Sequence, residues 1–503
     1  MIPKRILITA AFLCYIIIGR AVDFTNYYQF KDSLLTIVGL ENAGERDSIL
    51  NRFWQDLKSS RQIPFAIGDS VAFLYRGNYS SISWAGDFSG WSPVSGTRLE
   101  PTDVWILERS FPSDARLDYK IVRPNNNWIL DPNNPYKQMS GFGYNSELRM
   151  PDYIYPSETI RDPDAPAHHI TNWTIIFSQA LGYDVQYRVY TPAGYDTLSN
   201  LPVIYVTDGQ EYSDSRMGSM LEVLDNLIFW GAIRPVMAVF ISPVNPSNSL
   251  DNRRMNEYNL NPSFAEFVAQ ELVPVIDQQY KTDPRPEARV ILGTSMGGLN
   301  SMFFGITRSE IFGLIAIQSP AFNQNPTIYS MVRDSVKKPL TIIMQTGVIH
   351  DTQDAARQMK GILESKGYTL QYKEVNEGHS WGNWRALLDD ILIYFFGTGV
   401  TEIEQRFRIP GNGDFRLFPN FPNPFNGQTK LHFELKRDAF VKISIFDMLG
   451  RKIASFKKGK LQAGSYKMPI PESVFRRKPS GIYFYEIKFN QSIYLRGKML
   501  YLK

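Results

Sequence analysis

The stretch that decides the fold is ARVILGTSMGGLNSMFFGI, residues 288–306. Its apolar start is typical of a buried strand, and the residues after Gly298 are typical of a helix. Between them, Ser295 stands in GTSMGG with glycines on both sides. A sharp turn from strand to helix needs small neighbours, and it exposes the serine hydroxyl above the sheet. An incidental glycine-rich turn is the alternative, but this context predicts a nucleophilic Ser295.

Residues 153–398 alternate apolar runs with helical stretches. The stretch 263–280 predicts a helix that opens with a capping box of Ser263 and Glu266. Alternation of this kind predicts a mostly parallel sheet wrapped by helices, which is the α/β class. Together with the serine turn, it predicts an α/β-hydrolase catalytic domain. Strands buried on both faces are predicted at 201–206, 236–242, 288–293, 314–319, 340–347 and 370–375.

Two further residues complete a candidate triad, which in this fold follows the chain order serine, acid, histidine. His379 lies in EGHSWGNW, just after the last predicted strand, and the chain has only five histidines. Asp351 is the first carboxylate after the strand before it. Asp354 is the alternative acid, but its place in the first turn of the next helix is typical of a capping residue. We therefore predict Ser295 as nucleophile, His379 as general base and Asp351 as the orienting acid.

Acyl transfer through such a triad also needs N–H groups that stabilise an oxyanion. The residue after the nucleophile, Met296, offers one backbone N–H. The second donor is expected in the loop after the strand at 201–206, where the sequence reads TDGQEY. The backbone N–H of Gln210 or of Glu211 is therefore the second candidate.

The stretches PVIYVTDGQEY, RRMNEY, QELVPVID, GTSMGGL, AIQSPAF and EGHSWGNW carry a family resemblance. On these stretches, residues 170–398 resemble the enterochelin-esterase-like and esterase-D-like hydrolases. The resemblance implies the same serine triad. The family includes siderophore esterases, feruloyl and acetyl-xylan esterases and mycolyl transferases, so the fold alone does not fix the substrate. Arg253, Arg254 and Glu257 belong to a family stretch and would either grip a polar substrate or pair with one another.

Residues 63–152 change to a β pattern, and short strands are predicted in VAFLYRG, SISWAGDF, VWILERSF, LDYKIVR and NWILD. This pattern predicts a small antiparallel, immunoglobulin-like β-sandwich. The stretches SWAGDFSGWSP, DYKIV and WILDPNNP resemble the glycogen-binding-type (CBM48-like) module found beside glycan-active enzymes. The resemblance implies a sugar platform of Trp91, Lys120 and Trp128, because aromatic faces stack on sugar rings and lysine donates to hydroxyls. The alternative is that both tryptophans are core and the module only braces the enzyme.

The C-terminal part, residues 415–503, returns to a β pattern after a linker predicted at 399–414. It contains FPNFPNPFN, IFDMLGRK and SGIYFYEI in this order, and on these motifs it resembles the C-terminal sorting domain of the type IX secretion pathway. The resemblance implies a further β-sandwich and contact with the type IX secretion machinery. An unrelated adhesive or fibronectin-like sandwich is the alternative.

The N-terminus predicts export. Lys4 and Arg5 precede an apolar run, and small residues follow at 19 and 21, which is the pattern of a signal peptide at 1–21. The only cysteine, Cys14, lies inside this segment, so the mature chain would have no disulfide and no thiolate site. Residues 22–62 are predicted as a helical lead-in whose apolar face packs on the next domain.

Composition narrows the class of function. The net charge is only +4, although residues 415–503 carry 18 lysines and arginines against 5 acidic residues. This balance does not favour a nucleic-acid partner, and no further stretch predicts a membrane span. No metal or cofactor motif is present, so hydrolysis would need only water. We therefore expect a secreted or cell-surface serine esterase, exported through the periplasm, that acts on acetyl or feruloyl esters of polysaccharide. The alternatives are a siderophore-type or small-molecule esterase and a non-catalytic glycan-binding surface protein.

Overall fold

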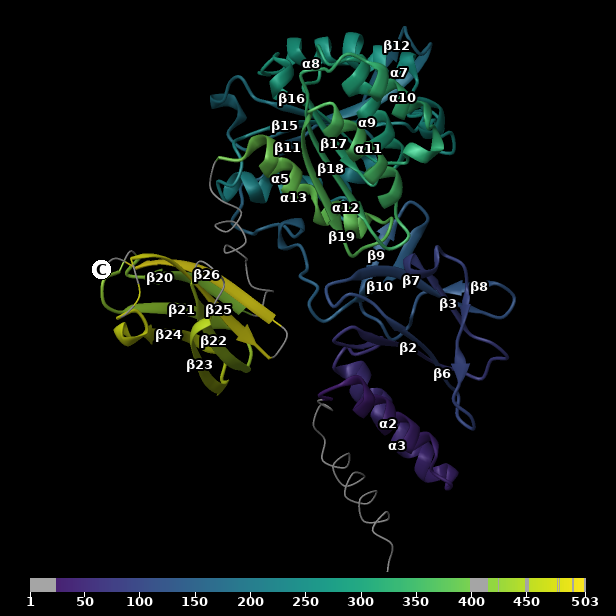
Figure 1. Ribbon diagram of the computed structural model, residues 1–503, viewed down its shortest axis with the longest axis vertical. Helices are drawn as coiled ribbons and strands as arrows, with labels where there is room; N and C mark the ends of the chain where they lie inside the picture. Colours follow the sequence, from purple (N-terminus) through teal and green to yellow (C-terminus); the bar gives the residue numbers. More distant parts are fainter. Residues whose placement is uncertain are drawn as a thin grey trace, which may run out of the picture.

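The computed structural model describes residues 24–398 and 415–501, apart from 424, 448–451, 477, 479 and 491–492 (Figure 1). The predicted signal peptide and the predicted linker at 399–414 lie outside the described residues. The described chain contains an N-terminal helix pair with two antiparallel sheets, a nine-stranded mixed sheet covered by helices, and a C-terminal β-sandwich. This architecture confirms the predicted fold class.

The catalytic domain is built on the nine-stranded sheet, whose order is β11-β13-β15-β14-β16-β17-β18-β19, with β12 paired to β13. The strands from β14 to β19 are parallel to one another, whereas β11, β12 and β13 add an antiparallel edge beside β15 that the sequence did not predict. Every residue of β14 to β17 is buried, as expected for strands covered on both faces. The strands are β11 His169–Ile170, β12 Thr174–Ser178, β13 Tyr183–Thr191, β14 Val203–Val206, β15 Met237–Ser242, β16 Arg289–Thr294, β17 Leu314–Gln318, β18 Thr341–Gly347 and β19 Thr369–Val375.

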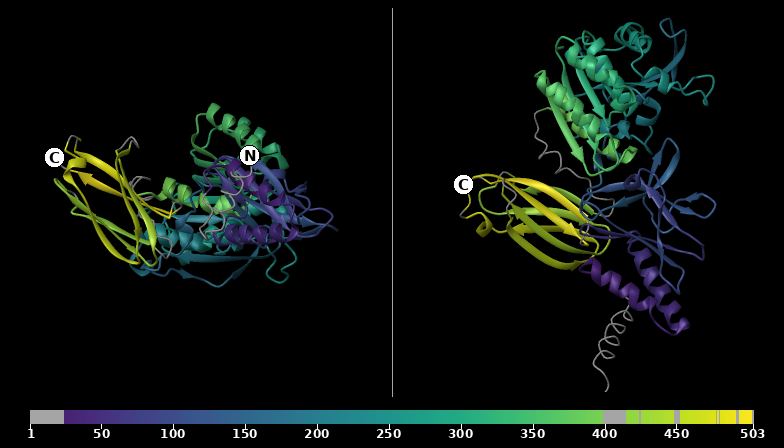
Figure 2. Two further views of the ribbon diagram at one scale, coloured as in Figure 1. Left: turned by 90° about the horizontal axis from the view of Figure 1, so that it is seen from below. Right: turned by 45° about the vertical axis from the view of Figure 1, so that its right-hand side comes forward.

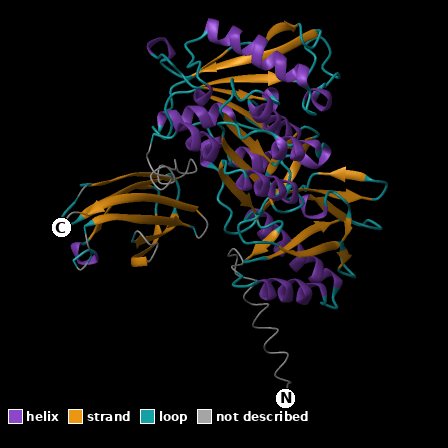
Figure 3. Cartoon of the chain, turned by 45° about the horizontal axis from the view of Figure 1, so that its top comes forward, coloured by secondary structure: helices purple, strands orange, loops and turns teal. Residues whose placement is uncertain are grey.

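Helices cover both faces of this sheet (Figure 3). Apolar side chains of α7, α8, α9, α10 and α11 form one core layer. Those of α5, α12 and α13 form the layer on the opposite face. The helices are α4 Gly209–Tyr212, α5 Met220–Phe229, α6 Arg254–Glu257, α7 Pro262–Glu266, α8 Val273–Gln279, α9 Met296–Thr307, α10 Thr327–Asp334, α11 Gln353–Ser365, α12 Trp381–Ala386 and α13 Leu388–Phe396.

The long helix predicted at 263–280 is present, but its start was predicted wrongly. A π-helical segment separates α7 from α8. The cap is Asn261, whose side-chain oxygen accepts the backbone N–H of Ser263 at 2.9 Å. Pro262 fits at the first helical position because its missing N–H is not needed there. The asparagine before the proline therefore starts the helix two residues before the predicted capping box.

The strand order reverses beside β14, and this reversal positions the site. β14 has β15 on one side and β16 on the other, both parallel to it. Loops at the carboxyl ends of strands spread apart at such a switch point, and ligands of open α/β sheets bind in the resulting crevice. The loop after β14 and the turn after β16 both lie at this crevice.

Two antiparallel sheets form the N-terminal sandwich. One has the order β1-β2-β6-β5, and the other has the order β4-β3-β7-β10-β9, with β8 paired to β7. Between the sheets lies a core that includes the fully buried Phe73, Trp84 and Tyr119. A short 3₁₀ turn, η1, spans Asp87–Ser89. The strands are β1 Phe65–Ile67, β2 Ser70–Arg76, β3 Ser83–Gly86, β4 Val94–Ser95, β5 Thr97–Arg98, β6 Val104–Ser110, β7 Arg116–Arg123, β8 Asn127–Ile129, β9 Lys137–Ser140 and β10 Gly143–Arg149.

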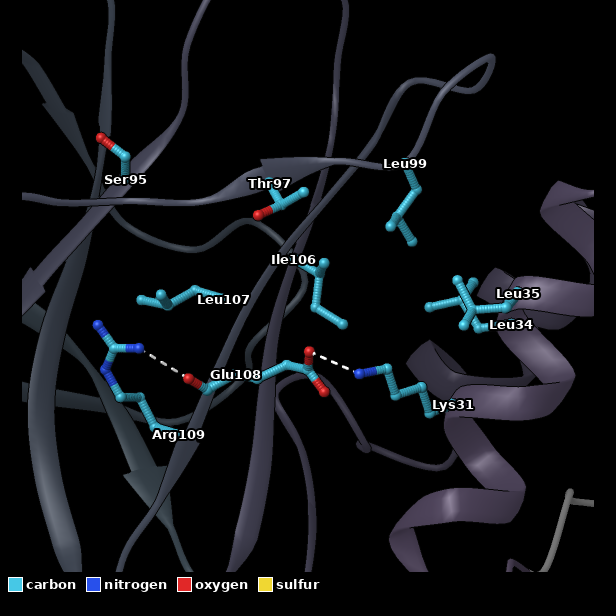
Figure 4. Close-up of a pocket in the computed structure, with 10 residues that line it drawn as sticks. All are labelled: Lys31, Leu34, Leu35, Ser95, Thr97, Leu99, Ile106, Leu107, Glu108 and Arg109. Atoms are coloured by element: carbon cyan, nitrogen blue, oxygen red, sulfur yellow. Dashed lines mark hydrogen bonds and ion pairs between the residues drawn. The ribbon is translucent and has the colours of Figure 1, made fainter.

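The lead-in consists of two helices, α2 (Tyr27–Val38) and α3 (Ala43–Ser59). Their apolar faces pack on residues of β1, β2 and β6. A hollow of about 360 Å³ remains between α2 and β6, and an ion pair of 2.9 Å between Lys31 and Glu108 lies beside it (Figure 4). None of the predicted site residues lines this hollow.

The C-terminal domain is a sandwich of a three-stranded sheet, β20-β21-β24, and a four-stranded sheet, β23-β22-β25-β26. Its core is rich in buried aromatic residues, among them Phe415, Phe433 and Phe489. The strands are β20 Phe415–Phe421, β21 Thr429–Leu435, β22 Ala439–Phe446, β23 Lys452–Leu461, β24 Gly464–Ile470, β25 Gly481–Phe489 and β26 Ile493–Tyr501.

Two kinds of feature are absent from the described residues. No helix among them has both the length and the apolar character needed to cross a membrane. Among the same residues, no group of three or more His, Cys, Asp or Glu side chains is arranged to hold a metal ion.

Candidate active site

Ser295 lies on the sharp turn between β16 and α9. Its backbone has φ 58° and ψ −116°, a conformation that residues with a side chain rarely adopt. The neighbouring glycines make the turn sterically feasible. A Cβ atom on Gly293 would lie 2.4 Å from the backbone of Gly297, and one on Gly297 would lie 2.7 Å from Thr207 Oγ1. The turn is therefore closely packed on both sides of the serine.

The structure brings Ser295, His379 and Asp351 together, although 84 residues separate the first two in the sequence. Ser295 Oγ is 3.0 Å from His379 Nε2, and His379 Nδ1 is 2.6 Å from Asp351 Oδ1. An ionised Asp351 can only accept, so Nδ1 carries the proton and Nε2 is free to accept the serine proton. The histidine side chain is 34% exposed, so a substrate can reach it from solvent. This arrangement can activate a serine hydroxyl for attack on a carbonyl carbon.

The Asp351 carboxylate is fully buried and surrounded by donors. It accepts the backbone N–H of Gly347 at 2.6 Å, the backbone N–H of Thr352 at 2.8 Å and the Ser319 hydroxyl at 2.6 Å. Burial alone would raise the pKa of this group. The hydrogen bond and the charge of His379, together with the other donors, instead hold the pKa of Asp351 below its ordinary value. The acid therefore stays ionised and fixed in orientation.

The other candidates for acid and base lie elsewhere. Asp354 is in the first turn of α11, where its side chain is 90% exposed and is paired with an arginine of the same helix. His168 and His432 have partners of their own, outside this site. His350 directly precedes the buried acid. Of the two acids considered from the sequence, only Asp351 contacts His379.

Two of the three candidate oxyanion donors, Met296 and Gln210, lie in the first turns of helices, whereas the backbone N–H of Glu211 already donates to the carbonyl of Asp208 at 2.9 Å. Met296 is the first residue of α9, and Gln210 is the second residue of α4. Backbone N–H groups in a first turn have no acceptor inside their own helix. Arg254 links the two loops, because its Nε bonds both carboxylate oxygens of Asp208 at 2.8 and 2.9 Å and its Nη2 bonds the carbonyl of Thr294 at 3.0 Å. Sequence reasoning did not identify this link.

Arg253, Arg254 and Glu257 have separate principal partners, so the expected mutual pairing is not what the structure shows. Arg253 forms an ion pair of 3.2 Å with Asp251, and its guanidinium lies 4.0 Å from the ring centre of Tyr183. The Tyr183 hydroxyl donates to Glu257 Oε1 at 2.9 Å. Burial raises the pKa of Glu257 to about 7. Arg254 alone of the three bonds both the loop after β14 and the turn that carries Ser295.

The family model described as "Putative esterase" matches residues 178–395, the range that holds Ser295, Asp351 and His379. Most of the catalytic domain thus matches this esterase family model. A second family model, "Secretion system C-terminal sorting domain", matches residues 420–500. A sorting domain of the type IX pathway marks the esterase for secretion or for the cell surface.

Relatives of the esterase differ in the activities that their names give. The iron(III) enterobactin esterase of Dickeya dadantii is 23% identical over 64% of this chain and 84% of its own length. The endo-1,4-beta-xylanase/feruloyl esterase of Xylanibacter ruminicola is 28% identical over 43% of this chain and 30% of its own length. A crystal structure of the enterobactin esterase of Shigella flexneri has a TM-score of 0.55 at 22% identity and covers 65% of this chain and 92% of its own. That likeness establishes the fold.

Several side chains of the esterase site were missed from the sequence. Trp384 places its ring edge-on to the imidazole of His379, with ring centres 4.9 Å apart, and its Nε1 donates to Ser319 at 2.9 Å. Trp381 Nε1 donates to Glu211 Oε2 at 2.8 Å. Burial, and then the charge of Asp208, raises the pKa of Glu211 to about 7. A usable signal existed for Ser319, because it is the last residue of a strand predicted at 314–319.

Two of the three residues predicted as a sugar platform share one face of a sandwich sheet. Trp128 of β8 pairs with Val122 of β7, and side chains at every second position of a strand share a face. Lys120 therefore lies on the same sheet face as Trp128, and both are half-buried. Trp91 follows η1 and donates its Nε1 to Asp87 at 3.3 Å. All three residues lie outside the sandwich core, whose buried tryptophans are others.

Glu377, two residues before His379, is buried and gives a testable pH dependence. Burial raises its pKa from 4.5 to about 7, although Arg116 Nη1 lies 3.9 Å away. A raised carboxyl pKa means that its stabilising contribution is complete below about pH 4.5 and is lost as the pH rises towards 7. We expect Glu377→Gln to raise the apparent melting temperature relative to wild type at pH 8, with the difference shrinking towards pH 5. Calorimetric scans across this range measure it, and a constant difference would contradict the assignment.

Proposed function

We propose that this chain is a secreted serine carboxylic ester hydrolase in which Ser295 is the nucleophile, His379 the general base and Asp351 the orienting acid. One observation carries the proposal. A serine on a strained strand-to-helix turn donates to a histidine at 3.0 Å, and that histidine donates to a buried carboxylate at 2.6 Å. Mutual geometry of this kind is how such triads are recognised on unrelated folds.

The reaction would proceed through an acyl-serine. Ser295 Oγ attacks the ester carbonyl carbon while His379 Nε2 takes the hydroxyl proton, and the carbonyl oxygen becomes an oxyanion. The backbone N–H groups of Met296 and Gln210 would stabilise that oxyanion, a contribution of ~2.7–4 kcal/mol for a single donor. The imidazolium then protonates the leaving alcohol. Water attacks the acyl-serine with His379 again as base, which releases the carboxylic acid and restores Ser295.

For the substrate class we propose acetyl or feruloyl esters of polysaccharide. The sorting domain delivers the enzyme outside the cell, where a polymer too large to import would be met. Lys120 and Trp128 offer a cation and an aromatic face on one half-buried surface of the sandwich, which suits sugar rings. A relative is named as a feruloyl esterase.

A second candidate is a siderophore-type or other small-molecule ester. It is favoured by the likeness to the Shigella flexneri enterobactin esterase, which covers 65% of this chain and therefore more than the catalytic domain alone. If no ester were hydrolysed, the remaining candidate would be a non-catalytic glycan-binding surface protein.

The substrate test compares polymer and small esters with one variant. We expect hydrolysis of acetylated xylan and feruloylated arabinoxylan, and a KM for these polymers that rises about fivefold in Trp128→Ala, since a lost aromatic contact costs ~1 kcal/mol. The KM for p-nitrophenyl acetate should not change in this variant. Tyr28→Ala, which removes an exposed aromatic residue from α2, is the matched control and should leave both values unchanged. Turnover of catechol-type siderophore esters without turnover of either polymer would instead select the second candidate.

A further inference from the structure

The second sheet of the N-terminal sandwich contacts the loop that carries the catalytic base. We call residues 376–382 the histidine loop. The backbone N–H of Arg116, the first residue of β7, donates to the carbonyl of Asn376 at 3.3 Å. Arg116 Nη1 donates to the Ser380 hydroxyl at 2.9 Å. Figures 1 and 2 show the N-terminal sheets directly against the end of the catalytic domain that holds β19 and α12.

Two glycines of the histidine loop show how close this contact is. A Cβ atom on Gly378 would lie 2.3 Å from Asp87 Cγ. A Cβ atom on Gly382 would lie 2.0 Å from Arg116 Cζ. Real Cβ atoms do not approach other heavy atoms so closely. The sandwich therefore touches the loop immediately before and shortly after His379.

The same module also contacts the loop that carries the acid. We call residues 347–352 the acid loop. Ile349 packs against the core of the sandwich, and its N–H donates to the carbonyl of Glu377 at 3.1 Å. A Cβ atom on Gly90, which follows η1, would lie 3.6 Å from His350 Nδ1. Thus the histidine loop and the acid loop, which are joined by the His379–Asp351 hydrogen bond, both contact the sandwich.

Arg116 is held rigidly on the sandwich side. Its side chain is fully buried, its Nη2 donates to Asp118 Oδ1 at 2.5 Å and its Nε donates to Glu147 Oε1 at 3.1 Å. With Ser380 as the third partner, the guanidinium is bonded in three directions, which fixes its position better than an ammonium could. A fixed guanidinium can transmit the position of β7 to the histidine loop.

The nucleophile, in contrast, is anchored within the catalytic domain. The Ser295 N–H donates to the carbonyl of Gln318 at 2.9 Å, and the Ala321 N–H donates to the carbonyl of Ser295 at 2.9 Å. From these contacts we infer that the N-terminal sandwich positions the base and the acid of the triad, and that Arg116 is the central positioning residue. This inference rests on the triad proposed above. Loosening the contact should impair proton transfer and leave substrate binding intact.

Two substitutions in the histidine loop should loosen the contact. Because Arg116 itself is kept, its buried partners in the sandwich, Asp118 and Glu147, stay paired. Ser380→Ala removes the acceptor of the Arg116 hydrogen bond, and Gly382→Ala forces a side chain against the guanidinium. Misplacement by about 1 Å costs ~100-fold in rate. With p-nitrophenyl acetate, we expect kcat to fall about tenfold in Ser380→Ala and about 100-fold in Gly382→Ala, while KM stays within about threefold of wild type.

The pH profile separates positioning from a loss of folded protein. A looser His379–Asp351 contact stabilises the imidazolium less, so the acidic limb of kcat/KM should move to lower pH in both variants. The controls are Ser330→Ala, whose hydroxyl bonds the carbonyl of Thr327 in its own helix, and Gly361→Ala, a helical glycine with open space around it. Neither control should change kcat or the position of the acidic limb of the kcat/KM profile.

Failure of the positioning role and failure of the proposed function would give different results. Unchanged kcat, a change confined to KM, or a lower kcat with an unmoved acidic limb would each overturn the inference. If Gly382→Ala does not fold, Ser380→Ala decides alone. An active Ser295→Ala enzyme would reject the triad itself, whereas an inactive Ser295→Ala enzyme with fully active contact variants would reject only the positioning role.

Discussion

Ser295→Ala should abolish ester hydrolysis, with a loss of about 10⁴–10⁶ in kcat for p-nitrophenyl acetate. The reason is that the hydroxyl is the only group of the triad that can form the acyl intermediate, and the His379–Asp351 pair has nothing to activate without it. The fold should survive, because alanine removes only one oxygen atom from the half-buried Ser295. Stopped assays on purified protein, together with a melting curve, measure both quantities.

The matched control for Ser295 is Ser301→Ala in α9, the helix that follows the turn. The Ser301 hydroxyl is buried and has no hydrogen-bond partner in the structure, so its removal tests only the loss of a serine from α9. That variant should keep near wild-type kcat. Retention of activity within tenfold by Ser295→Ala would reject the nucleophile assignment.

Asp351→Asn should reduce kcat by about 10⁴, because an amide in this position favours the wrong tautomer of the histidine. The asparagine side chain can donate to Nδ1, so the imidazole proton moves to Nε2 and the serine proton has no acceptor. The variant keeps the size of the buried side chain, and its remaining oxygen can still accept a neighbouring N–H. Kinetics at pH 7–8 with p-nitrophenyl acetate provide the measurement.

Asp354→Asn is the paired comparison, only three residues away. Its carboxylate is 90% exposed on α11, so its replacement should leave kcat close to wild type. If Asp354→Asn lost far more activity than Asp351→Asn, the triad acid would have to be reassigned. Equal small losses in both variants would show that His379 needs neither carboxylate.

The relation between Ser295, Asp351 and His379 could be predicted because it follows from topology. Each of the three residues follows a strand in the sequence, and the carboxyl ends of parallel strands meet at one edge of the sheet. The chain order of triads in this fold is serine, acid, histidine, and it predicts which of the two later residues is the acid and which is the base. The same logic would have found Ser319, which also follows a strand at that edge and donates to the acid.

The contact between Arg116 and Ser380 could not be predicted in this way. These residues are 264 positions apart and lie in different domains. Hydrophobic periodicity shows which face of β7 is buried, but it does not show what buries it. The ion pair between Arg254 and Asp208 could not be predicted either, because it forms where two irregular loops meet in the folded protein. Such polar pairs depend on tertiary geometry that local sequence does not encode.

The glycines at 378 and 382 limit how the domains of this protein can be exchanged with those of other proteins. Any side chain at position 378 would displace the side chain of Asp87, and any side chain at position 382 would displace that of Arg116, so substitutions at the contact between the two domains are coupled. A sandwich grafted from another protein would need the same narrow clearance opposite both glycines. The sandwich and the hydrolase therefore have to be exchanged together, and a library of chimeras should keep activity only where the crossover falls outside residues 87–382.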